Sequence, residues 1–321
     1  MNAIVYTGLR ELKLLDVETP SPGTDEVLIR VEAAGICGSE LEGVATNSPF
    51  RVPPLIMGHE FIGRRMDDGK RVAVNPLVSC GLCDLCRGGR QNICRQRAII
   101  GIQRPGAFAE FVAVPTANCI EMDVNHDTAI PNAVFTEPIA NAVHALALAS
   151  AGDASLPPRV GIIGAGPVGF AVAFVAVNEG VESVAISDLS VDRRNLAEAS
   201  GAHSVTTELE GEFDWIFDAV GTEQTRAMSV DLVRPGGTVI WIGLHGKGAT
   251  LDVPKLVREE KRIVASFCYT PSDFSRAAEL VWALEPGLVA ARPLEDGVAA
   301  FLGLMGGDQR DLKTALVPSG A

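Results

Sequence analysis

Four cysteines stand close together in the sequence, at a spacing typical of metal ligands. Cys80, Cys83, Cys86 and Cys94 follow the pattern Cys-x2-Cys-x2-Cys-x7-Cys. Four thiolates complete the tetrahedral shell that Zn²⁺ prefers and leave no position open for a reactant. The segment 77–95 has few apolar residues, so a metal would replace a hydrophobic core there. The spacing predicts a structural zinc site; free surface thiols or a redox group are the alternatives.

A second set of possible metal ligands is dispersed along the chain. Cys37 lies in Gly-Ile-Cys-Gly-Ser, His59 and Glu60 lie in Gly-His-Glu, and Glu137 lies in Thr-Glu-Pro. A thiolate, an imidazole and a carboxylate with a free fourth position are the ligands of a catalytic zinc ion. Taken singly, each residue also has a structural explanation: a buried thiol, a hydrogen-bonded imidazole or a carboxylate at a helix N-terminus. The residues alone leave both explanations open.

A glycine-rich turn carries the third chemical signal. Gly164, Gly166 and Gly169 form a Gly-x-Gly-x-x-Gly pattern between an apolar strand and a helix that begins near Pro167 and Val168. The first two glycines let the backbone approach a pyrophosphate at the helix N-terminus, and the third allows close helix–strand packing. The context predicts a dinucleotide site at this turn; a glycine-rich turn that serves packing only is the alternative.

The residues after the next strand indicate which dinucleotide is bound. Asp188 ends that strand, where its carboxylate would bind the adenine-ribose hydroxyls and repel a 2′-phosphate. Arg193, five residues further on, could tolerate such a phosphate. We expect NAD to be preferred over NADP.

The composition sets limits on partners and compartment. The chain has 321 residues, 47% of them hydrophobic, and a formal net charge of −13. This charge argues against nucleic acid or an anionic membrane as a partner, because the chain lacks the excess of basic residues that would form a positively charged surface. Seven cysteines and no signal-peptide pattern favour a reducing compartment, the cytoplasm. The uncharged run 160–177 is long enough for a membrane span, but its glycines favour a strand, a turn and a helix.

The elements that must position the metal ligands are mostly short strands. Up to about residue 120, runs with β-type alternation are separated by Pro and Gly turns, at 26–32, 70–74 and 107–114. This pattern is typical of a small β-barrel or sandwich. A helix is expected over 137–150, and a linker over 152–158.

From residue 159 the chain alternates strands with helices. Such alternation predicts a parallel sheet with helices on both faces. We expect helices up to 178 and over 191–200, and strands at 160–163, 184–187, 215–217 and 237–243. The segment 313–317, near the C-terminus, could return as a strand to the first domain.

The order of these motifs resembles that of the zinc-dependent medium-chain alcohol dehydrogenase family, over essentially the whole chain. The branch with Glu at position 137, in Glu-Pro-Ile-Ala-Asn-Ala-Val-His, is similar to sorbitol, butanediol, threonine and sugar-alcohol-phosphate dehydrogenases. The resemblance implies an α/β protein with two domains. They are a GroES-like β-rich catalytic domain, residues 1–147 completed by 285–321, and a Rossmann domain with a doubly wound parallel sheet, residues 148–284.

The resemblance also assigns roles in the site. It implies two zinc ions per chain, one structural and one catalytic, with Cys37 and His59 as ligands of the catalytic ion. The third ligand would be Glu60 or Glu137. The nicotinamide half of NAD would be held at the end of a later strand by Ile242, Gly243 and Leu244. Since the family usually forms dimers or tetramers, we expect a homodimer or homotetramer.

The chemistry implied is oxidation of an alcohol. Zinc would stabilise the alkoxide of the substrate, the carbinol carbon would give its hydride to nicotinamide, and Ser39 would relay the proton. The family often has Asp-x-His after Cys-Gly-Ser. This chain has Glu40-Leu-Glu42, so Glu42 takes the place of the usual relay histidine.

The predicted activity is therefore NAD-dependent, zinc-dependent oxidation of a small secondary alcohol, diol or polyol. Loops at 46–51 and 267–271 would supply the substrate pocket. A threonine dehydrogenase-type activity stays open, as does a non-catalytic nucleotide-binding protein with structural zinc only. A zinc-free quinone reductase is a third alternative, against which Cys37, His59 and Glu137 argue.

Overall fold

Two units with different architectures make up the fold. The computed structural model describes the chain except residues 47, 123–126, 151–157, 308–309 and 320–321. Unit 1 comprises Met1–Glu137 and Thr270–Ala321, and unit 2 comprises Pro138–Tyr269. The domain limits predicted from the sequence lie further along the chain, at 147/148 and 284/285, and stay a prediction. The predicted linker falls, up to residue 157, outside the described residues.

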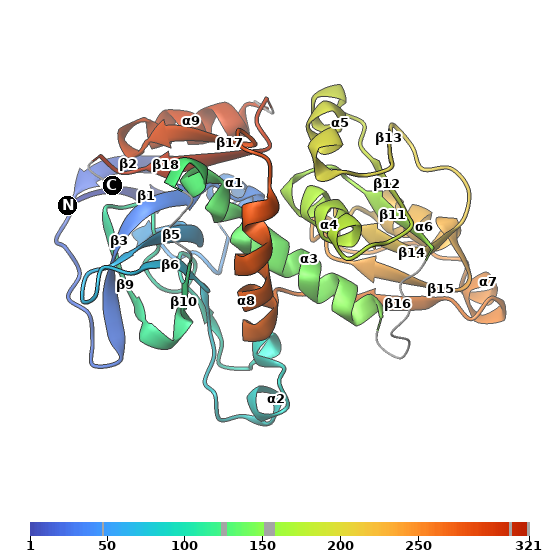
Figure 1. The fold of residues 1–321 in the computed structure, drawn as a ribbon, viewed down its shortest axis with the longest axis horizontal. Coiled ribbons are helices and arrows are strands. Elements are labelled where there is room, and N and C mark those ends of the chain that lie inside the picture. The colour runs from blue at the N-terminus through green and yellow to red at the C-terminus, as the bar shows by residue number, and fades with distance from the viewer. Residues whose placement is uncertain (47, 123–126, 151–157, 308–309, 320–321) are drawn as a thin grey trace. The chain divides into compact units, whose positions relative to one another are not determined.

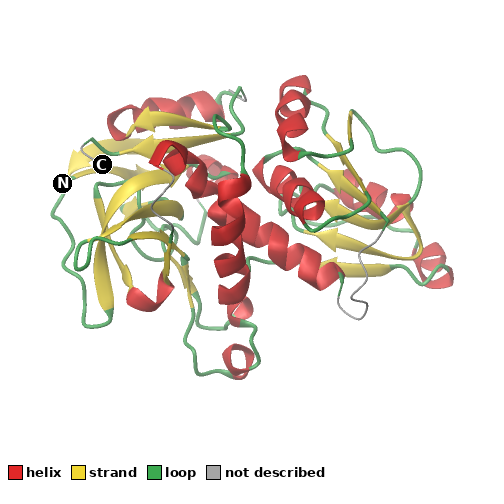
Figure 2. Ribbon diagram, in the orientation of Figure 1, coloured by secondary structure: helices red, strands yellow, loops and turns green. Residues whose placement is uncertain are grey.

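Unit 1 is built on β-sheets (Figures 1 and 2). Its largest sheet has the order β10-β6-β5-β3-β18-β17, with β9 also paired to β3. These strands are β3 (Glu26–Gly35), β5 (Glu60–Arg65), β6 (Arg71–Val74), β9 (Phe111–Pro115), β10 (Cys119–Glu121), β17 (Val289–Pro293) and β18 (Lys313–Val317). Two smaller sheets consist of β2 (Glu11–Asp16), β1 (Asn2–Gly8) and β4 (Leu55–Ile56), and of β7 (Leu77–Val78) and β8 (Ala98–Ile99). The α-helices of this unit are α1 (Gly38–Thr46), α2 (Asp84–Arg87), α8 (Pro271–Leu280) and α9 (Gly297–Met305).

The C-terminal tail completes the sheet of unit 1. Strand β18 forms where the sequence predicted it and pairs antiparallel with β3, with Ala315 opposite Gly35. In Figure 1, β18 and its neighbour β17 are coloured red as part of the C-terminal tail, and β3 is blue. From the same tail, the ring of Phe301 on α9 packs edge-on against Phe108 at 5.4 Å, inside the core of the unit. Lys313, the first residue of β18, is buried, and its Cδ would lie 3.2 Å from a Cβ at Gly35 on β3.

One predicted strand of unit 1 is shorter than expected. The alternation at 107–114 yields a strand only from Phe111. Before it, Phe108 donates its N–H to Met57 O and accepts from Ile4 N, and Ala107 donates to Gly58 O. The alternation therefore identified the buried side chains. Ala107 and Phe108, however, bond to two separate segments, around residue 4 and at 57–58, and so they do not form a continuous strand ladder.

Unit 2 contains one parallel sheet of the order β13-β12-β11-β14-β15-β16. The strands are β11 (Arg159–Ile163), β12 (Ser183–Ser187), β13 (Ser204–Thr206), β14 (Phe213–Asp218), β15 (Val233–Trp241) and β16 (Arg262–Ala265). The helices are α3 (Thr136–Ala149), which begins at the end of unit 1, and α4 (Pro167–Asn178), α5 (Val191–Ala197), α6 (Glu223–Leu232) and α7 (Val253–Arg258). From β11, the strand order runs outward through β12 and β13 on one side and through β14, β15 and β16 on the other. This is the doubly wound arrangement, which binds dinucleotides where the direction of the strand order changes.

The apolar run at 160–177 proves to be a strand, a turn and a helix. Strand β11 ends at Ile163 and helix α4 begins at Pro167. Within the described residues, the structure contains no helix with the length and apolar character needed to cross a bilayer.

Candidate functional site

The four clustered cysteines converge in unit 1, in the loop that carries α2. Neighbouring sulfur atoms lie 3.5 Å apart for Cys83–Cys86 and Cys80–Cys94, and 3.9 Å apart for Cys80–Cys86 and Cys83–Cys94. A zinc ion with four bonds of about 2.3 Å requires sulfur–sulfur edges of about 3.8 Å. The geometry therefore fits a closed tetrahedral metal site.

Backbone groups around the cluster favour thiolates. The N–H of Cys80 and that of Gln96 point to the sulfur of Cys94, and the N–H of Cys86 points to that of Cys83. Backbone donors lower the pKa of Cys80, Cys83 and Cys94, whereas burial raises the pKa of Cys86 to about 11. A divalent cation would offset the charge that four thiolates place together.

The dispersed ligands also come together in unit 1. Cys37 lies immediately before α1, and Glu60 begins β5, opposite Gly35 at the end of β3. The ligand atoms of Cys37, His59 and Glu60 all lie within 4.8 Å of one another. A thiolate, an imidazole and a carboxylate at this separation can hold a zinc ion and leave a fourth position for substrate.

Glu40 orients His59. One carboxylate oxygen of Glu40 contacts His59 Nδ1 at 2.8 Å and accepts the N–H of Gly58, and the other accepts the N–H of Cys37. Nε2 of His59 is thus the ring nitrogen available to a metal, in the carboxylate–histidine–metal arrangement. Burial disfavours both charges, but Glu40 and Cys37 raise the pKa of His59 well above its ordinary value, and His59 and Arg51 lower that of Glu40.

Lys313 pairs with Glu60. Its Nζ lies 2.5 Å from Glu60 Oε2, and both side chains are buried. Burial opposes the charge of Lys313, but Glu60, Cys37 and Glu137 outweigh this and raise the pKa of the ammonium. Lys313 thus compensates one oxygen of Glu60 and leaves the other for a metal.

The other predicted residues of this site lie at different places. Glu137 is half-buried at the start of α3 and acts electrostatically on Lys313, but it does not belong to the described group of converging ligand atoms. Ser39 is exposed, with its hydroxyl 3.5 Å from Cys37 Sγ. Glu42 is exposed on α1, and among the described residues its carboxylate makes no hydrogen bond or ion pair.

Glu40 and Lys313 were missing from the sequence prediction as members of this site, and Arg51 was included only as the end of the predicted pocket loop 46–51. Glu40 follows Cys-Gly-Ser directly, and its position in the motif was the one available signal. Arg51 donates to the hydroxyl of Ser39 at 3.1 Å, from a loop between α1 and β4. Lys313 is 253 positions from Glu60, and no local pattern links them.

The glycine turn of unit 2 has the geometry of a phosphate site. Gly164 has φ +95°, and a Cβ there would lie 2.5 Å from Val220 Cγ2. A Cβ at Gly169 would lie 1.8 Å from the carbonyl oxygen of Gly164, so α4 can pack this closely only with glycine there. Gly166 caps α4 with no side-chain hydrogen bond, and the first helical residues are Pro167 and Val168. The helix N-terminus is therefore open to an anion.

Asp188 lies next to this turn. Its carboxylate accepts the N–H of Ala165 at 2.8 Å and that of Ser190 at 2.9 Å. These bonds hold Asp188 at the carboxyl end of β12, and each oxygen keeps a lone pair for a ribose hydroxyl. Arg193 reaches the same turn: its Nη1 would lie 2.8 Å from a Cβ at Gly166. The structure thus brings the predicted acid and the predicted cation to one end of the sheet.

Ile242, Gly243 and Leu244 follow β15 at that end of the sheet. Ile242 and Gly243 donate their N–H groups to Asp218 O, and Leu244 is exposed. The Asp218 carboxylate, whose pKa burial raises, accepts the N–H groups of Val220 and Gly221. The loops after β14 and β15 are therefore fixed by one buried acid.

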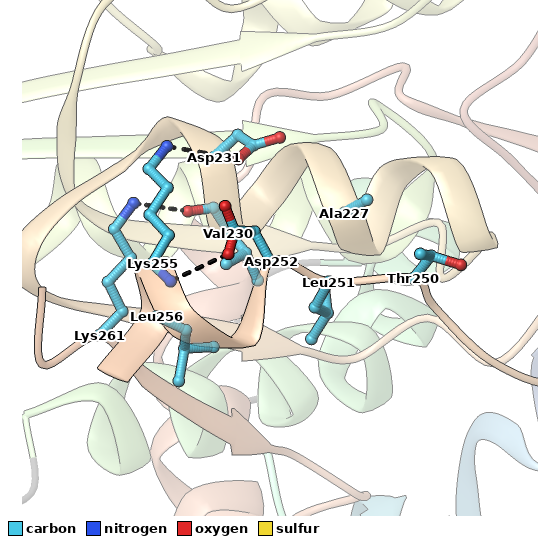
Figure 3. Close-up of a pocket in the computed structure, with 9 residues that line it drawn as sticks. All are labelled: Ala227, Val230, Asp231, Thr250, Leu251, Asp252, Lys255, Leu256 and Lys261. Carbon is cyan, nitrogen blue, oxygen red and sulfur yellow. Dashed lines mark hydrogen bonds and ion pairs between the residues drawn. The ribbon is translucent and has the colours of Figure 1, made fainter. Parts of the chain in front are cut away.

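A small pocket elsewhere in unit 2 contains none of the predicted site residues. Its volume is about 30 Å³, which leaves room for only a few water molecules. Figure 3 shows Lys261 reaching Val230 O and Lys255 directed at Asp231 beside it. The pocket is lined by Ala227, Val230, Asp231, Thr250, Leu251, Asp252, Lys255, Leu256 and Lys261. A dinucleotide does not fit there.

Comparison with known proteins identifies the family. The description "Alcohol dehydrogenase GroES-like domain" matches residues 23–124, and "Zinc-binding dehydrogenase" matches residues 167–283. The chain therefore belongs to the zinc-dependent medium-chain alcohol dehydrogenase family, with a GroES-like domain and a Rossmann domain. The predicted fold class and family are confirmed.

Individual relatives act on different substrates, according to their names. The chain is 31% identical to L-galactonate-5-dehydrogenase of Escherichia coli K12 over 304 residues, 88% of this chain and 87% of the relative. It is 33% identical to L-threonine 3-dehydrogenase of Streptomyces coelicolor over 274 residues, 77% of this chain and 78% of the relative. The structure of acetophenone reductase from Geotrichum candidum in complex with NAD matches with a TM-score of 0.85 and 27% identity, covering 98% and 96% of the two chains.

Proposed function

We propose that this chain is an NAD-dependent zinc dehydrogenase that oxidises a secondary hydroxyl of a small alcohol, diol or polyol. The observation that carries the proposal is the convergence of Cys37, His59 and Glu60 in a chain that also has an intact dinucleotide turn. In this proposal, unit 1 contains the catalytic domain and unit 2 the cofactor domain.

The chain's own residues divide the work. Cys37, His59 and Glu60 would hold the catalytic zinc, and the four-cysteine cluster would hold the structural one. A bound zinc ion supplies Lewis acidity that makes an alcohol easier to deprotonate. Glu40 holds the imidazole, Lys313 holds the carboxylate, and Ser39 offers a hydroxyl for the departing proton. The glycine turn of unit 2 would hold NAD, which would supply the hydride acceptor.

Metal analysis tests the catalytic assignment. We expect two zinc ions per chain, and one in a Cys37→Ala variant. A Glu60→Ala variant should lose the catalytic ion more readily than Glu137→Ala, because Glu60 is the carboxylate beside Cys37 and His59. One zinc per chain, unchanged by Cys37→Ala, would instead favour a nucleotide-binding protein with structural zinc only.

Cofactor preference depends on Asp188. Its carboxylate next to the turn supports NAD, since a 2′-phosphate would meet a negative charge. An Asp188→Ala variant should therefore lower the ratio of kcat/KM with NAD to that with NADP. An unchanged ratio would remove Asp188 from this role and shift attention to Arg193.

Substrate choice is tested by a panel read through NADH absorbance. L-galactonate, butanediol, sugar alcohols and their phosphates represent the polyol hypothesis, and L-threonine represents the alternative. The alternative is retained because L-threonine 3-dehydrogenases are among the relatives. The highest kcat/KM decides between them, and activity only on L-threonine would replace the polyol assignment.

The proposal extends to assembly and compartment. A homodimer or homotetramer is supported by the family resemblance and by β16, which ends the described sheet of unit 2 with an open edge. A cytoplasmic location is supported by seven cysteines without a disulfide between them. Light scattering on a sizing column tests the first, and a monomer at micromolar concentration would contradict it.

A further inference from the structure

Arg51 is a buried cation beside the candidate catalytic site. Only 6% of its surface is exposed. Among the described residues, its guanidinium makes one hydrogen bond, from Nη2 to Ser39 Oγ, and no ion pair, while Nε has no partner. The charge of Arg51 also acts on the buried Glu40 carboxylate without a direct ion pair, but its one direct polar contact among the described residues is the Ser39 hydroxyl.

The bond from Arg51 restricts what Ser39 can do. A hydroxyl has one proton and two lone pairs, and a guanidinium can only donate. Arg51 therefore occupies one lone pair of Ser39 Oγ. The hydroxyl proton must point elsewhere, and Cys37 Sγ lies 3.5 Å away. One lone pair remains, on an exposed residue, for a proton donor such as an alcohol.

Helix α1 is shaped to admit this guanidinium. A Cβ at Gly43 would lie 2.8 Å from Arg51 Cδ and 3.0 Å from Arg51 Nη1. The side chain thus packs against α1 where the helix has no side chain of its own. The position is specific, because Gly43 and Ser39 lie one turn apart on the same helix.

We propose that Arg51 is a positioning residue for proton transfer through Ser39, an inference that rests on the proposed dehydrogenase function. The substrate alcohol gives its proton to Ser39 Oγ while the hydroxyl proton of Ser39 leaves to water, so one O–H bond forms for each that breaks. Arg51 holds Oγ in place, and its charge stabilises the electron-rich oxygen during the exchange.

A double-mutant cycle tests whether Arg51 acts through Ser39. We expect Arg51→Met to lower kcat about tenfold, the value of a charge-assisted hydrogen bond, with KM changed less than about twofold. Ser39→Ala should lower kcat at least as much, and adding Arg51→Met to it should cause no further loss. Arg51→Lys should recover part of the rate. Arg104→Met, which removes a partly exposed guanidinium paired with Glu26, is the control and should match the wild type.

Two outcomes would overturn the proposal. If the losses of the single variants multiply in the double variant, Arg51 acts independently of Ser39. If Arg51→Met raises KM and leaves kcat unchanged, Arg51 binds substrate instead. Should Arg51→Met fail to fold, Gly43→Ala displaces the guanidinium without removing it and should show the same dependence on Ser39.

A spectroscopic readout separates this proposal from the dehydrogenase assignment. In cobalt-substituted protein, the thiolate-to-cobalt absorption reports on hydrogen bonds to Cys37, and no substrate is needed. Arg51→Met and Ser39→Ala should shift this band alike, whereas Arg104→Met should not. The absorption of the four-cysteine site cancels when the wild-type spectrum is subtracted from that of the variant. An unshifted band in Arg51→Met, in an enzyme that oxidises alcohols, overturns the role of Arg51 alone. A wild-type protein that oxidises no alcohol on the panel overturns the proposed function. The shifts of the cobalt absorption band would still test the contact between Arg51 and Ser39 in that case.

Discussion

At the scale of single residues, the candidate catalytic site depends on pairs of buried charges. Glu60 and Lys313 are each about 1% exposed, and each is the ion-pair partner of the other. Glu40 is fully buried and has both oxygens engaged with His59 and backbone N–H groups. Removing one member of such a pair leaves an uncompensated buried charge, which costs more than the pair contributes.

Lys313→Met should therefore destabilise the metal-free protein by roughly 3 kcal/mol, the cost of breaking a buried pair on one side. The loss should be smaller in zinc-loaded protein, because the metal would then compensate the Glu60 carboxylate. Urea unfolding of both forms measures the difference. Lys70→Met removes an exposed ion pair with Glu121 and should change stability by less than about 1 kcal/mol. Equal losses for the two variants would show that the charge of Glu60 needs no partner.

Gly35 leaves the space that the Glu60–Lys313 pair occupies. A Cβ at this position would lie 2.6 Å from Glu60 Oε2 and 3.2 Å from Lys313 Cδ. Gly35→Ala should displace the carboxylate and weaken zinc binding at the Cys37 site by about tenfold, as expected for a disturbed ligand support. Metal content after dialysis against a chelator measures this. Gly38→Ala is the matched control, since nothing lies within 4 Å of a Cβ there; equal zinc retention in both variants would contradict the prediction.

At the scale of elements, the sequence predicted the buried parallel strands best. The runs at 160–163, 184–187, 215–217 and 237–243 overlap β11, β12, β14 and β15, because a strand covered on both faces is apolar throughout. The strands of unit 1 were harder to predict, since their pairings join segments that are distant in the sequence. The run at 107–114 shortens to β9 for that reason.

The same distinction holds for the site. Short motifs whose residue types indicate metal binding contain Cys37, His59 and the four clustered cysteines. The supporting residues Arg51 and Lys313 have no such motif. Arg51 depends on the path of a loop back to α1, and Lys313 depends on β18 pairing with β3. Those contacts are set by the folded chain, so the sequence pattern alone could not supply them.

Gly169 tests how closely α4 must approach the turn before it. The carbonyl of Gly164 is backbone and cannot move aside as a side chain would, so a methyl group at 1.8 Å forces the helix away. Gly169→Ala should lower stability by about 1–3 kcal/mol, the usual cost of overpacking. It should also weaken NADH binding, since the N–H groups of α4 move. Gly248→Ala, with nothing near a Cβ, should do neither, and NADH titration followed by fluorescence compares them. Unchanged affinity in Gly169→Ala would mean that α4 does not hold the pyrophosphate.

At the scale of the whole molecule, metal and nucleotide belong to different units. Both groups of converging metal ligands lie in unit 1, and the dinucleotide turn lies in unit 2. Each unit has its own apolar cluster, one around Tyr6 and Phe61 and one around Phe213 and Ile216. A ligand stabilises the region that it binds, so the two ligands should protect different parts of the chain.

Hydrogen exchange resolved by peptide can show this separation. Removing zinc with a strong chelator should speed exchange in β7, β8 and the loop between them, because that loop has little apolar surface to keep it folded without metal. NADH at about one hundred times its dissociation constant should add about 2.7 kcal/mol of stability, felt first as slower exchange at the end of β11 and the start of α4. A Cys94→Ser variant should reproduce the effect of the chelator in unit 1 and leave the protection by NADH intact. If chelation instead abolishes the NADH protection, the metal in unit 1 controls the folding of unit 2, and the two units form one cooperative structure.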